Sequence, residues 1–305
     1  MLSGASDRIW HRPGVFQLQR CRCGLVATRP RPTAEALPAY YDHTYSGTGR
    51  HSARIERAQK NDAMYALQHR QRLAALLAAR PLQPGDRLLD VGCSYGGFLR
   101  YARRRTGCDA TGIDVDADAL TAALDRTDIR YIATDLESFD APEGSFAAVV
   151  FLESLEHLPD PAGALRAARR LIADDGVCVV EVPNYDGWMR RLFKTAWLPL
   201  LVPQHLYHFT PATLSAALDE AGFQVVSHRN LFWPGETMFS LGIWTAAALR
   251  IPPPGSPFTW RTPFDITVFV VLLVMLLTLE LPIHLALWAL GKTGHQIAVA
   301  RPAAE

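Results

Sequence analysis

The chain has 305 residues, which is enough for one large domain or two small ones. Its hydrophobic share of 49% and charged share of 20% are typical of a globular protein, and its formal net charge of +1 indicates no general attraction to nucleic acid, so no nucleic-acid partner is expected. Only two of the five cysteines lie close together, and residues 1–14 lack the apolar run of a signal peptide. We therefore expect a reducing, cytoplasmic location rather than a disulfide-stabilised secreted protein.

Residues 1–50 are expected to be irregular, and apolar spacing predicts one or two helices over 51–80. Short apolar runs then alternate with helical patterns. The predicted strands cover 87–91, 110–113, 130–133, 146–152, 177–182, 224–227 and 296–300, and the predicted helices between them cover 96–105, 117–124, 161–172 and 210–222. This alternation predicts an α/β fold in which helices cover both faces of a parallel sheet.

A glycine-rich turn, Asp90-Val91-Gly92-Cys93-Ser94-Tyr95-Gly96-Gly97, joins the first predicted strand to its helix. Glycines at such a turn let a ligand approach the backbone, and the N–H groups at the start of the helix face that ligand. The spacing differs from the G-x-G-x-x-G of dinucleotide-binding loops, and a carboxylate at Asp90 suits a ligand with a positive amino group. Asp114 closes the second strand, where a carboxylate can bind ribose hydroxyls. Asp135 and Leu136 follow the third strand, where they could bind an adenine edge.

Residues from about 85 to 183 resemble the core of class I S-adenosylmethionine-dependent methyltransferases of the small-molecule type, and they are similar to ubiquinone-pathway O-methyltransferases. The resemblance implies a Rossmann-like, seven-stranded, mostly parallel sheet with an antiparallel last strand, and S-adenosyl-L-methionine as cofactor. At Ser94 the family more often has glycine. The cofactor-binding residues that the resemblance implies are Asp90, Gly92, Cys93, Ser94, Gly96, Asp114, Val115, Asp135, Leu136 and Glu153.

The fourth predicted strand is followed by Glu153-Ser154-Leu155-Glu156-His157, at the end of the sheet where acceptor and cofactor should meet. Ubiquinone-pathway and small-RNA 2′-O-methyltransferases carry a similar Glu-x-x-Glu-His with a later histidine, and they bind a divalent cation. That similarity implies a site for an ion such as Mg²⁺ formed by Glu153, Glu156, His157 and His205, with His208 as the alternative histidine. Metal-independent relatives carry a run similar to the one around His205. The alternative is therefore that His157 or His205 is the general base.

The N-terminal segment contains Cys21 and Cys23 in a Cys-x-Cys-Gly pattern, which resembles the zinc knuckle at the start of many such methyltransferases. The second cysteine pair of that knuckle is missing, and His11 would add only a third ligand, so zinc is not expected. We predict a degenerate knuckle that serves as a lid. The tyrosines expected to cover the cofactor are Tyr40, Tyr41 and Tyr45.

Two apolar segments raise the question of a membrane. Residues 187–202 mix Trp, Phe and Leu with basic residues, which is typical of an interfacial amphipathic helix, and the alternative is a lid over an apolar acceptor pocket. Residues 266–290 are long enough to span a bilayer, but Glu280 and His284 interrupt the run. Because the last strand must return to the sheet, 238–248 and 266–290 should form a pair that enters the membrane and returns, or that packs on the protein. We expect peripheral or monotopic attachment to the cytoplasmic face of the membrane.

The sequence thus predicts a protein with several parts. They are an N-terminal lid with the degenerate knuckle (1–50), a methyltransferase core (51–230) with an acceptor or membrane insertion (184–209), an apolar helical insertion (231–293), and the last strand with the tail (294–305). The predicted function is methyl transfer from S-adenosylmethionine to a small, lipophilic acceptor, with oxygen favoured as the acceptor atom. The alternatives are an NAD(P)-dependent Rossmann oxidoreductase, against which Asp90 and the glycine spacing argue, and a non-catalytic, membrane-docked cofactor-binding module.

Overall fold

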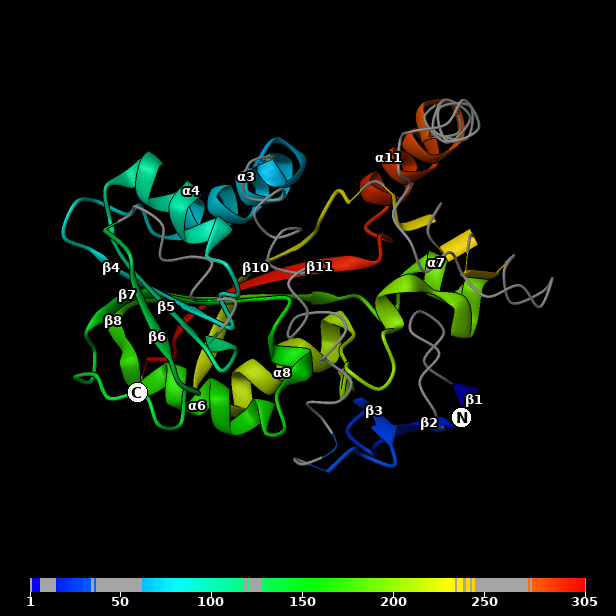
Figure 1. Ribbon diagram of the computed structural model, residues 1–305, viewed down its shortest axis with the longest axis horizontal. Coiled ribbons are helices and arrows are strands. Elements are labelled where there is room, and N and C mark those ends of the chain that lie inside the picture. The colour runs from blue at the N-terminus through cyan, green and yellow to red at the C-terminus, as the bar shows by residue number, and fades with distance from the viewer. Residues whose placement is uncertain are drawn as a thin grey trace. The chain divides into compact units, whose positions relative to one another are not determined.

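A computed structural model of the chain consists of two compact units (Figure 1). The sheet unit comprises 33–182, 211–229 and 296–305, and the accessory unit comprises 1–32, 183–210 and 230–295. The structure describes residues 2–5, 15–33, 36, 62–117, 120, 128–233, 235–237, 240–241, 243–244, 274 and 276–304. The predictions that lie outside these residues concern His11, Tyr40, Tyr41, Tyr45, the first part (51–61) of the helical region at 51–80, most of the helix at 117–124, and most of 238–248 and 266–275.

The sheet unit contains a seven-stranded sheet with the strand order β10-β11-β8-β7-β4-β5-β6. Its strands are β4 (Arg87–Val91), β5 (Asp109–Asp114), β6 (Arg130–Ala133), β7 (Phe146–Leu152), β8 (Ile172–Pro183), β10 (Phe223–Asn230) and β11 (His295–Pro302). The five strands from β8 to β6 pair in parallel, and the last strands are antiparallel. The predicted Rossmann-like fold with its antiparallel last strand is confirmed.

Helices lie on both faces of this sheet, as the sequence predicts (Figure 1). One pair is α3 (Asp62–Ala79) and α4 (Gly97–Thr106), and the other is α6 (Pro161–Leu171) and α8 (Pro211–Glu220). The predicted start of α6 is confirmed, because Asp160 Oδ1 accepts a hydrogen bond from the Gly163 N–H at 3.0 Å and Pro161 takes the first helical position. Between the two helical layers, Phe146 to Phe151 of β7 are all buried, which explains their continuous apolar run.

The boundaries of β8 differ from the prediction. The helix before it ends at Leu171, and the strand begins at Ile172 rather than at Val177. Ile172 pairs with Phe146, and the register shifts before Ala148 pairs with Val177. The pairing with β7 therefore extends the strand into residues that, taken alone, favour a loop.

The accessory unit contains a four-stranded sheet with the order β1-β2-β3-β9, in which neighbouring strands are antiparallel. Its strands are β1 (Leu2–Ala5), β2 (Phe16–Arg20), β3 (Val26–Arg29) and β9 (Tyr207–His208). The expectation of an irregular N-terminal segment is thus wrong for its described residues. Cys21 and Cys23 are free, exposed cysteines in the turn between β2 and β3.

The insertion at 184–209 does not form the single amphipathic helix predicted over 187–202. Helix α7 (Trp188–Phe193) ends where Lys194 adopts a φ of 52°, and two short 3₁₀ turns follow, η2 (Lys194–Ala196) and η3 (Leu198–Leu200). The left-handed residue and the proline at position 199 stop the helix, and Trp197 is buried. The prediction of a continuous helix is wrong for this reason.

The apolar insertion (231–293) ends with a π-helical turn, η4 (Leu276–Glu280), which continues directly into α11 (Leu281–Ala289). Among the residues that the structure describes, no helix combines the length and apolar character needed to cross a membrane. Glu280 and His284, which interrupt the apolar run of the sequence, are both buried.

Candidate active site

The carboxyl ends of the parallel strands meet at one edge of the sheet. Asp90 of β4 pairs in register with Gly112 of β5 and with Val150 of β7, and Asp114 of β5 pairs with Ala133 of β6. Residues that end or follow these strands therefore lie next to one another, in the place where open α/β sheets bind their ligands.

The glycine-rich turn after β4 adopts the left-handed backbone that its sequence predicts. Gly92 has a φ of 76°, and a Cβ at this position would lie 2.6 Å from the Cβ of Ser154. Gly96 has a φ of 69°, and a Cβ there would overlap the hydroxyl of Tyr131. Ser94 also has a positive φ, of 48°, which explains why glycine is the more usual residue at its position in the family it resembles.

Asp90 lies beneath this turn with its carboxyl group buried. It is only 3% exposed, and its Oδ1 has no hydrogen-bond partner among the residues that the structure describes. Burial raises the pKa of Asp90 to about 7, an effect that Arg72 opposes and that the charges of Asp114 and Glu181 increase. A ligand with an ammonium group would supply the missing partner and favour the ionised carboxylate.

Asp114 connects the end of β5 to the glycine-rich turn. Its Oδ2 accepts a hydrogen bond from the Ser94 N–H at 2.8 Å, and its Oδ1 accepts one from the Asp116 N–H at 2.9 Å. Burial raises its pKa above the ordinary value for aspartate. Each carboxylate oxygen can accept a further hydrogen bond, so the pair remains suited to two neighbouring hydroxyl groups of a ligand.

The remaining residues predicted to bind cofactor differ in exposure. Leu136 and Cys93 are buried, and Asp135 is exposed with its Oδ1 accepting a hydrogen bond from the Ser138 N–H at 2.7 Å. Val115 is exposed. Their cofactor contacts stay predictions.

An ion pair that the sequence did not reveal lies beside Asp90. Arg72 of α3 donates from Nε and Nη2 to the two carboxylate oxygens of Glu181, at 2.6 and 2.8 Å, and Glu181 is buried in β8. Although burial alone would lower the pKa of Arg72, the charge of Glu181 and its hydrogen bond raise it above the ordinary value, and Glu153 and Asp90 add to the rise. The guanidinium group therefore offsets the charge of the buried Glu181 and also attracts the neighbouring carboxylates of Glu153 and Asp90.

The predicted acidic segment follows β7 as a tight turn. Glu153 adopts a φ of 58°, its N–H donates to the Glu181 carbonyl oxygen at 2.9 Å, and the 3₁₀ turn η1 (Leu155–His157) comes directly after it. Glu156 is fully buried, and burial raises its pKa to about 8, whereas His157 is half-buried. The structure thus brings Glu153, Glu156 and His157 together at the carboxyl end of β7.

His205 and His208 belong to the accessory unit, where both are buried. The Thr28 hydroxyl donates to the His205 carbonyl oxygen at 2.7 Å, and His208 Nε2 lies 3.0 Å from the same hydroxyl oxygen. Since that hydroxyl donates its hydrogen bond to the His205 carbonyl oxygen, Nε2 of His208 must donate to the Thr28 oxygen. The predicted metal set takes residues from both units, so the joining of His205 to the acidic segment stays a prediction.

A model of the family described as a methyltransferase domain matches residues 64–228, just over half of the chain. The chain belongs to the class I S-adenosylmethionine-dependent methyltransferases. It is 33% identical over 153 residues to a ubiquinone biosynthesis O-methyltransferase of Psychrobacter arcticus. The matched residues make up 46% of this chain and 59% of that relative. It is 31% identical over 161 residues to the enzyme of the same name from Xanthomonas campestris pv. campestris, which covers 49% of this chain and 67% of that relative. The chain thus spans less than two thirds of the first relative.

Two solved structures show the same fold at low sequence identity. Phosphoethanolamine N-methyltransferase 2 of Haemonchus contortus, in complex with S-adenosyl-L-methionine, has a TM-score of 0.56 at 17% identity and covers 92% of this chain and 63% of its own. A geranyl diphosphate methyltransferase in complex with the same cofactor has a TM-score of 0.51 at 17% identity, over 86% of this chain and 95% of its own. The methyltransferase fold therefore accounts for most of the chain.

Proposed function

We propose that the chain transfers the methyl group of S-adenosyl-L-methionine to an oxygen atom of a small, lipophilic acceptor. The observation that carries the proposal is the buried Asp90 carboxyl, which lies at the glycine-rich turn with one oxygen unpartnered among the described residues. An acid at this position suits the ammonium group of the cofactor and not a pyrophosphate. The similarity to ubiquinone biosynthesis O-methyltransferases supports oxygen as the acceptor atom, and the family match argues against a nicotinamide-dependent oxidoreductase.

The residues of the site have separate tasks in this proposal. When bound, S-adenosylmethionine supplies an electrophilic methyl group on a sulfonium centre, so the protein has mainly to position two reactants in line. Asp90 binds the ammonium group of the cofactor, Asp114 binds its ribose hydroxyls, and Asp135 with Leu136 binds its adenine edge. Arg72 pairs with the buried Glu181 carboxylate and so offsets that one negative charge beside the site.

An oxygen acceptor must lose its hydroxyl proton during methyl transfer. We assign this task to His157 or His205 acting as general base. Two carboxylates and two imidazoles, from Glu153, Glu156, His157 and His205, also suit a divalent cation such as Mg²⁺, which would bind the hydroxyl and lower its pKa. Full activity in EDTA and in a Glu153→Ala variant would leave the general base as the mechanism. Loss of activity in EDTA that added Mg²⁺ restores would establish the cation.

Calorimetry and a turnover assay test the function. We expect the chain to bind S-adenosylmethionine and not NAD(H), and we expect Asp114→Ala to weaken that binding. Asp109→Ala, at the opposite, exposed end of β5, should leave it unchanged.

With catechols that carry alkyl chains of increasing length, we expect methylated products by mass spectrometry and a KM that falls with chain length. Cofactor binding without turnover of any acceptor would instead favour the non-catalytic binding module.

We also propose that the accessory unit contacts a membrane surface. In α11 and the turn before it, the polar side chains of Glu280 and His284 are buried, whereas Leu285, Trp288 and Leu290 are exposed, the last by 71%. Although Leu287 is buried, most large apolar side chains here are exposed, unlike those of an ordinary surface helix, whose apolar residues face the protein. An outward apolar face with tryptophan at its end suits the boundary between lipid headgroups and acyl chains.

Helix α7 extends this surface. Trp188 and Leu192 are 58% and 64% exposed, and the Trp188 N–H donates to the Lys292 carbonyl oxygen at 3.0 Å, so α7 begins beside the end of α11. Arg191, Lys194 and Lys292 are also exposed, and their positive charges attract the negative charges of anionic lipid headgroups. The outer sides of α7 and α11 thus combine exposed tryptophans with basic residues.

Co-sedimentation with vesicles tests the membrane contact. We expect the chain to bind vesicles of phosphatidylcholine and phosphatidylglycerol, and to bind pure phosphatidylcholine less well. The double variant Trp188→Ser/Trp288→Ser should lose most of this binding. The control Val226→Ser, which removes an exposed apolar side chain from β10, should keep it. Equal sedimentation of the double variant and the control would contradict the proposal.

A further inference from the structure

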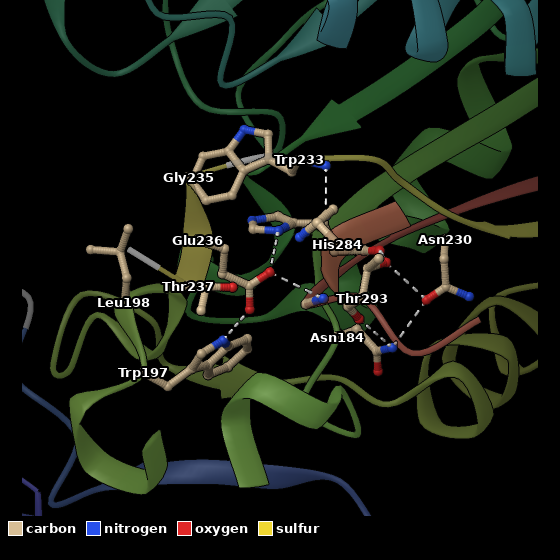
Figure 2. A network of polar contacts seen from close by, with 12 residues as sticks. Asn184, Trp197, Leu198, Asn230, Trp233, Gly235, Glu236, Thr237, His284 and Thr293 are labelled. Carbon is tan, nitrogen blue, oxygen red and sulfur yellow. Dashed lines mark hydrogen bonds and ion pairs between the residues drawn. The ribbon is translucent and has the colours of Figure 1, made fainter. Parts of the chain in front are cut away.

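A buried polar network lies within the accessory unit, outside the candidate active site (Figure 2). Its central residue is Glu236, which is fully buried. The Trp197 indole N–H donates to Glu236 Oε1 at 2.5 Å, the Gly294 N–H donates to Oε2 at 3.2 Å, and Nδ1 of His295 lies 4.0 Å from Oε2. One carboxylate therefore contacts two stretches of chain, around Trp197 and at Gly294–His295, that are distant in sequence from each other and from Glu236.

A carboxyl group at this position costs folding free energy. Burial raises the pKa of Glu236 to about 7, against the effect of the hydrogen bonds from Trp197 and Gly294, and the charge of Glu280 raises it further. An apolar side chain of similar volume would avoid this cost. Gly294 also leaves space for the acid, because a Cβ there would overlap the Glu236 carboxyl group. Directional hydrogen bonds, rather than packing, are thus what Glu236 contributes.

The other titratable groups around Glu236 have bonds of their own. Glu280, which precedes α11, accepts hydrogen bonds from two backbone N–H groups of the segment that carries Glu236. His284 of α11 accepts one from the Trp233 N–H at 3.0 Å, and burial lowers its pKa to about 4, so it is neutral at pH 7. His295, at the start of β11, lies against the Trp233 ring, with 4.2 Å between ring centroids.

The partner of Glu236 belongs to the stretch that leads to His205. Trp197 comes directly before the η3 turn, and the next residue, Leu198, donates its N–H to Ser240 Oγ at 3.0 Å. The η3 turn is followed by Leu201, whose carbonyl oxygen accepts the His205 N–H at 2.9 Å. The Trp197 indole and the Leu198 N–H are therefore bonded to Glu236 and to Ser240 of the same segment. The His205 N–H is bonded to Leu201, which directly follows the η3 turn.

We propose that Glu236 is a positioning residue: through the Trp197 indole, its carboxylate fixes the backbone that carries His205. This inference rests on the proposed function, in which His205 lies on the acceptor side of the reaction. Ionised Glu236 accepts the indole N–H in a charge-assisted hydrogen bond, which is shorter and stronger than the bond that a protonated carboxyl accepts. The position of His205 therefore depends on the charge state of Glu236.

Nuclear magnetic resonance of the full chain tests this proposal without an acceptor. We expect the indole N–H signal of Trp197, assigned with a Trp197→Phe variant, and the amide signal of His205 to titrate together with a midpoint near pH 7. Glu236→Gln should abolish this shared titration, and Glu236→Leu should also displace both signals. Glu220→Gln, the same change in α8 of the other unit, should leave the titration intact. The proposal fails if neither signal titrates, or if the titration persists in Glu236→Gln.

Kinetics with an alkyl catechol separates positioning from a general loss of structure. We expect Glu236→Gln to raise the KM for the catechol by about three- to tenfold, with a smaller change in kcat and with unchanged calorimetric affinity for S-adenosylmethionine. A loss of cofactor affinity in this variant would contradict a role restricted to the acceptor side. If the wild type methylates no acceptor, the proposed function fails, whereas the magnetic resonance titration still decides the positioning role.

Discussion

Replacement of Asp90 by asparagine should stabilise the free chain at neutral and higher pH. Burial raises the pKa of Asp90 from 3.8 to about 7 in the folded chain, so the folded state retains a proton that the unfolded state releases. Stability therefore falls as pH rises from 3.8 to 7, and the full loss, about 4 kcal/mol, is present above pH 7. Asparagine has the same shape and no charge to bury. Because its amide also needs partners, we expect a gain of about 1–4 kcal/mol at pH 8.

The same substitution should weaken binding of S-adenosylmethionine. A hydrogen bond to a charged group contributes about 1.5–3 kcal/mol, so loss of the Asp90 carboxylate should raise the Kd by about ten- to a hundredfold. In the wild type, protons compete with the ammonium group for a carboxylate whose pKa is about 7. Affinity should thus fall about tenfold between pH 8 and pH 6 in the wild type, and this dependence should disappear in Asp90→Asn.

Calorimetric titration of the cofactor and urea unfolding of the free chain, both at pH 6 and pH 8, measure the two effects. Asp109→Asn is the control, because Asp109 is exposed at the opposite end of β5 and should change neither quantity. The reasoning would be refuted by an Asp90→Asn variant that binds the cofactor as tightly as the wild type at pH 8. A variant less stable than the wild type at pH 8 would show that burial of the ionised carboxyl group does not destabilise the folded chain.

Three further substitutions test the packing of charges and backbone. Arg72→Met leaves Glu181 buried without its partner and should lower the free energy of unfolding in urea by about 3–5 kcal/mol. The double variant Arg72→Met/Glu181→Met should recover most of this stability. No recovery would contradict the ion-pair account. Ser94→Gly should raise stability by about 0.5–1 kcal/mol in thermal unfolding, because the φ of 48° suits glycine. Glu280→Ala removes the acceptor of two backbone N–H groups and should lower the free energy of unfolding by about 1–3 kcal/mol. Leu285→Ser, at an exposed position, should change it by about 0.5 kcal/mol or less. A larger loss in Leu285→Ser than in Glu280→Ala would refute the orientation of α11.

The parallel sheet could be predicted from the sequence because each of its strands is a local apolar run followed by a helical pattern. The run from Phe146 to Leu152 is buried almost throughout, so it needs no polar alternation and is easily seen. The small N-terminal sheet could not be predicted in this way. In β2, Phe16 and Leu18 alternate with exposed glutamines, but the strand has only five residues, and the sheet also includes Tyr207–His208, far away in the sequence. Such distant pairing leaves no local signal.

The acids of the candidate site could be predicted because register places the ends of neighbouring parallel strands together. Asp90 and Asp114 follow directly from this rule. Arg72 could not, since it is one of several basic residues on a long helix and nothing in its neighbourhood marks it. Glu181 did leave a signal: it is the one charged residue in the apolar run from Val177 to Val182, and a charge buried in a central strand requires a partner.

The segment around α11 shows why apolar composition alone does not fix the place of a helix. An apolar run interrupted by Glu280 and His284 fits a flawed bilayer span or a helix packed on the protein, and the two alternatives require opposite orientations of the polar side chains. Both are buried in the accessory unit and bonded to residues 233–237, so the helix packs on the protein through these polar side chains and Leu287 and turns most of its other apolar residues outward. Residues 233–237 also include Glu236, which accepts the hydrogen bond of the Trp197 indole. The proposed membrane surface and His205 therefore belong to one connected unit. If His205 acts on the acceptor as proposed, vesicles should lower the KM for a long-chain catechol more than for a short one.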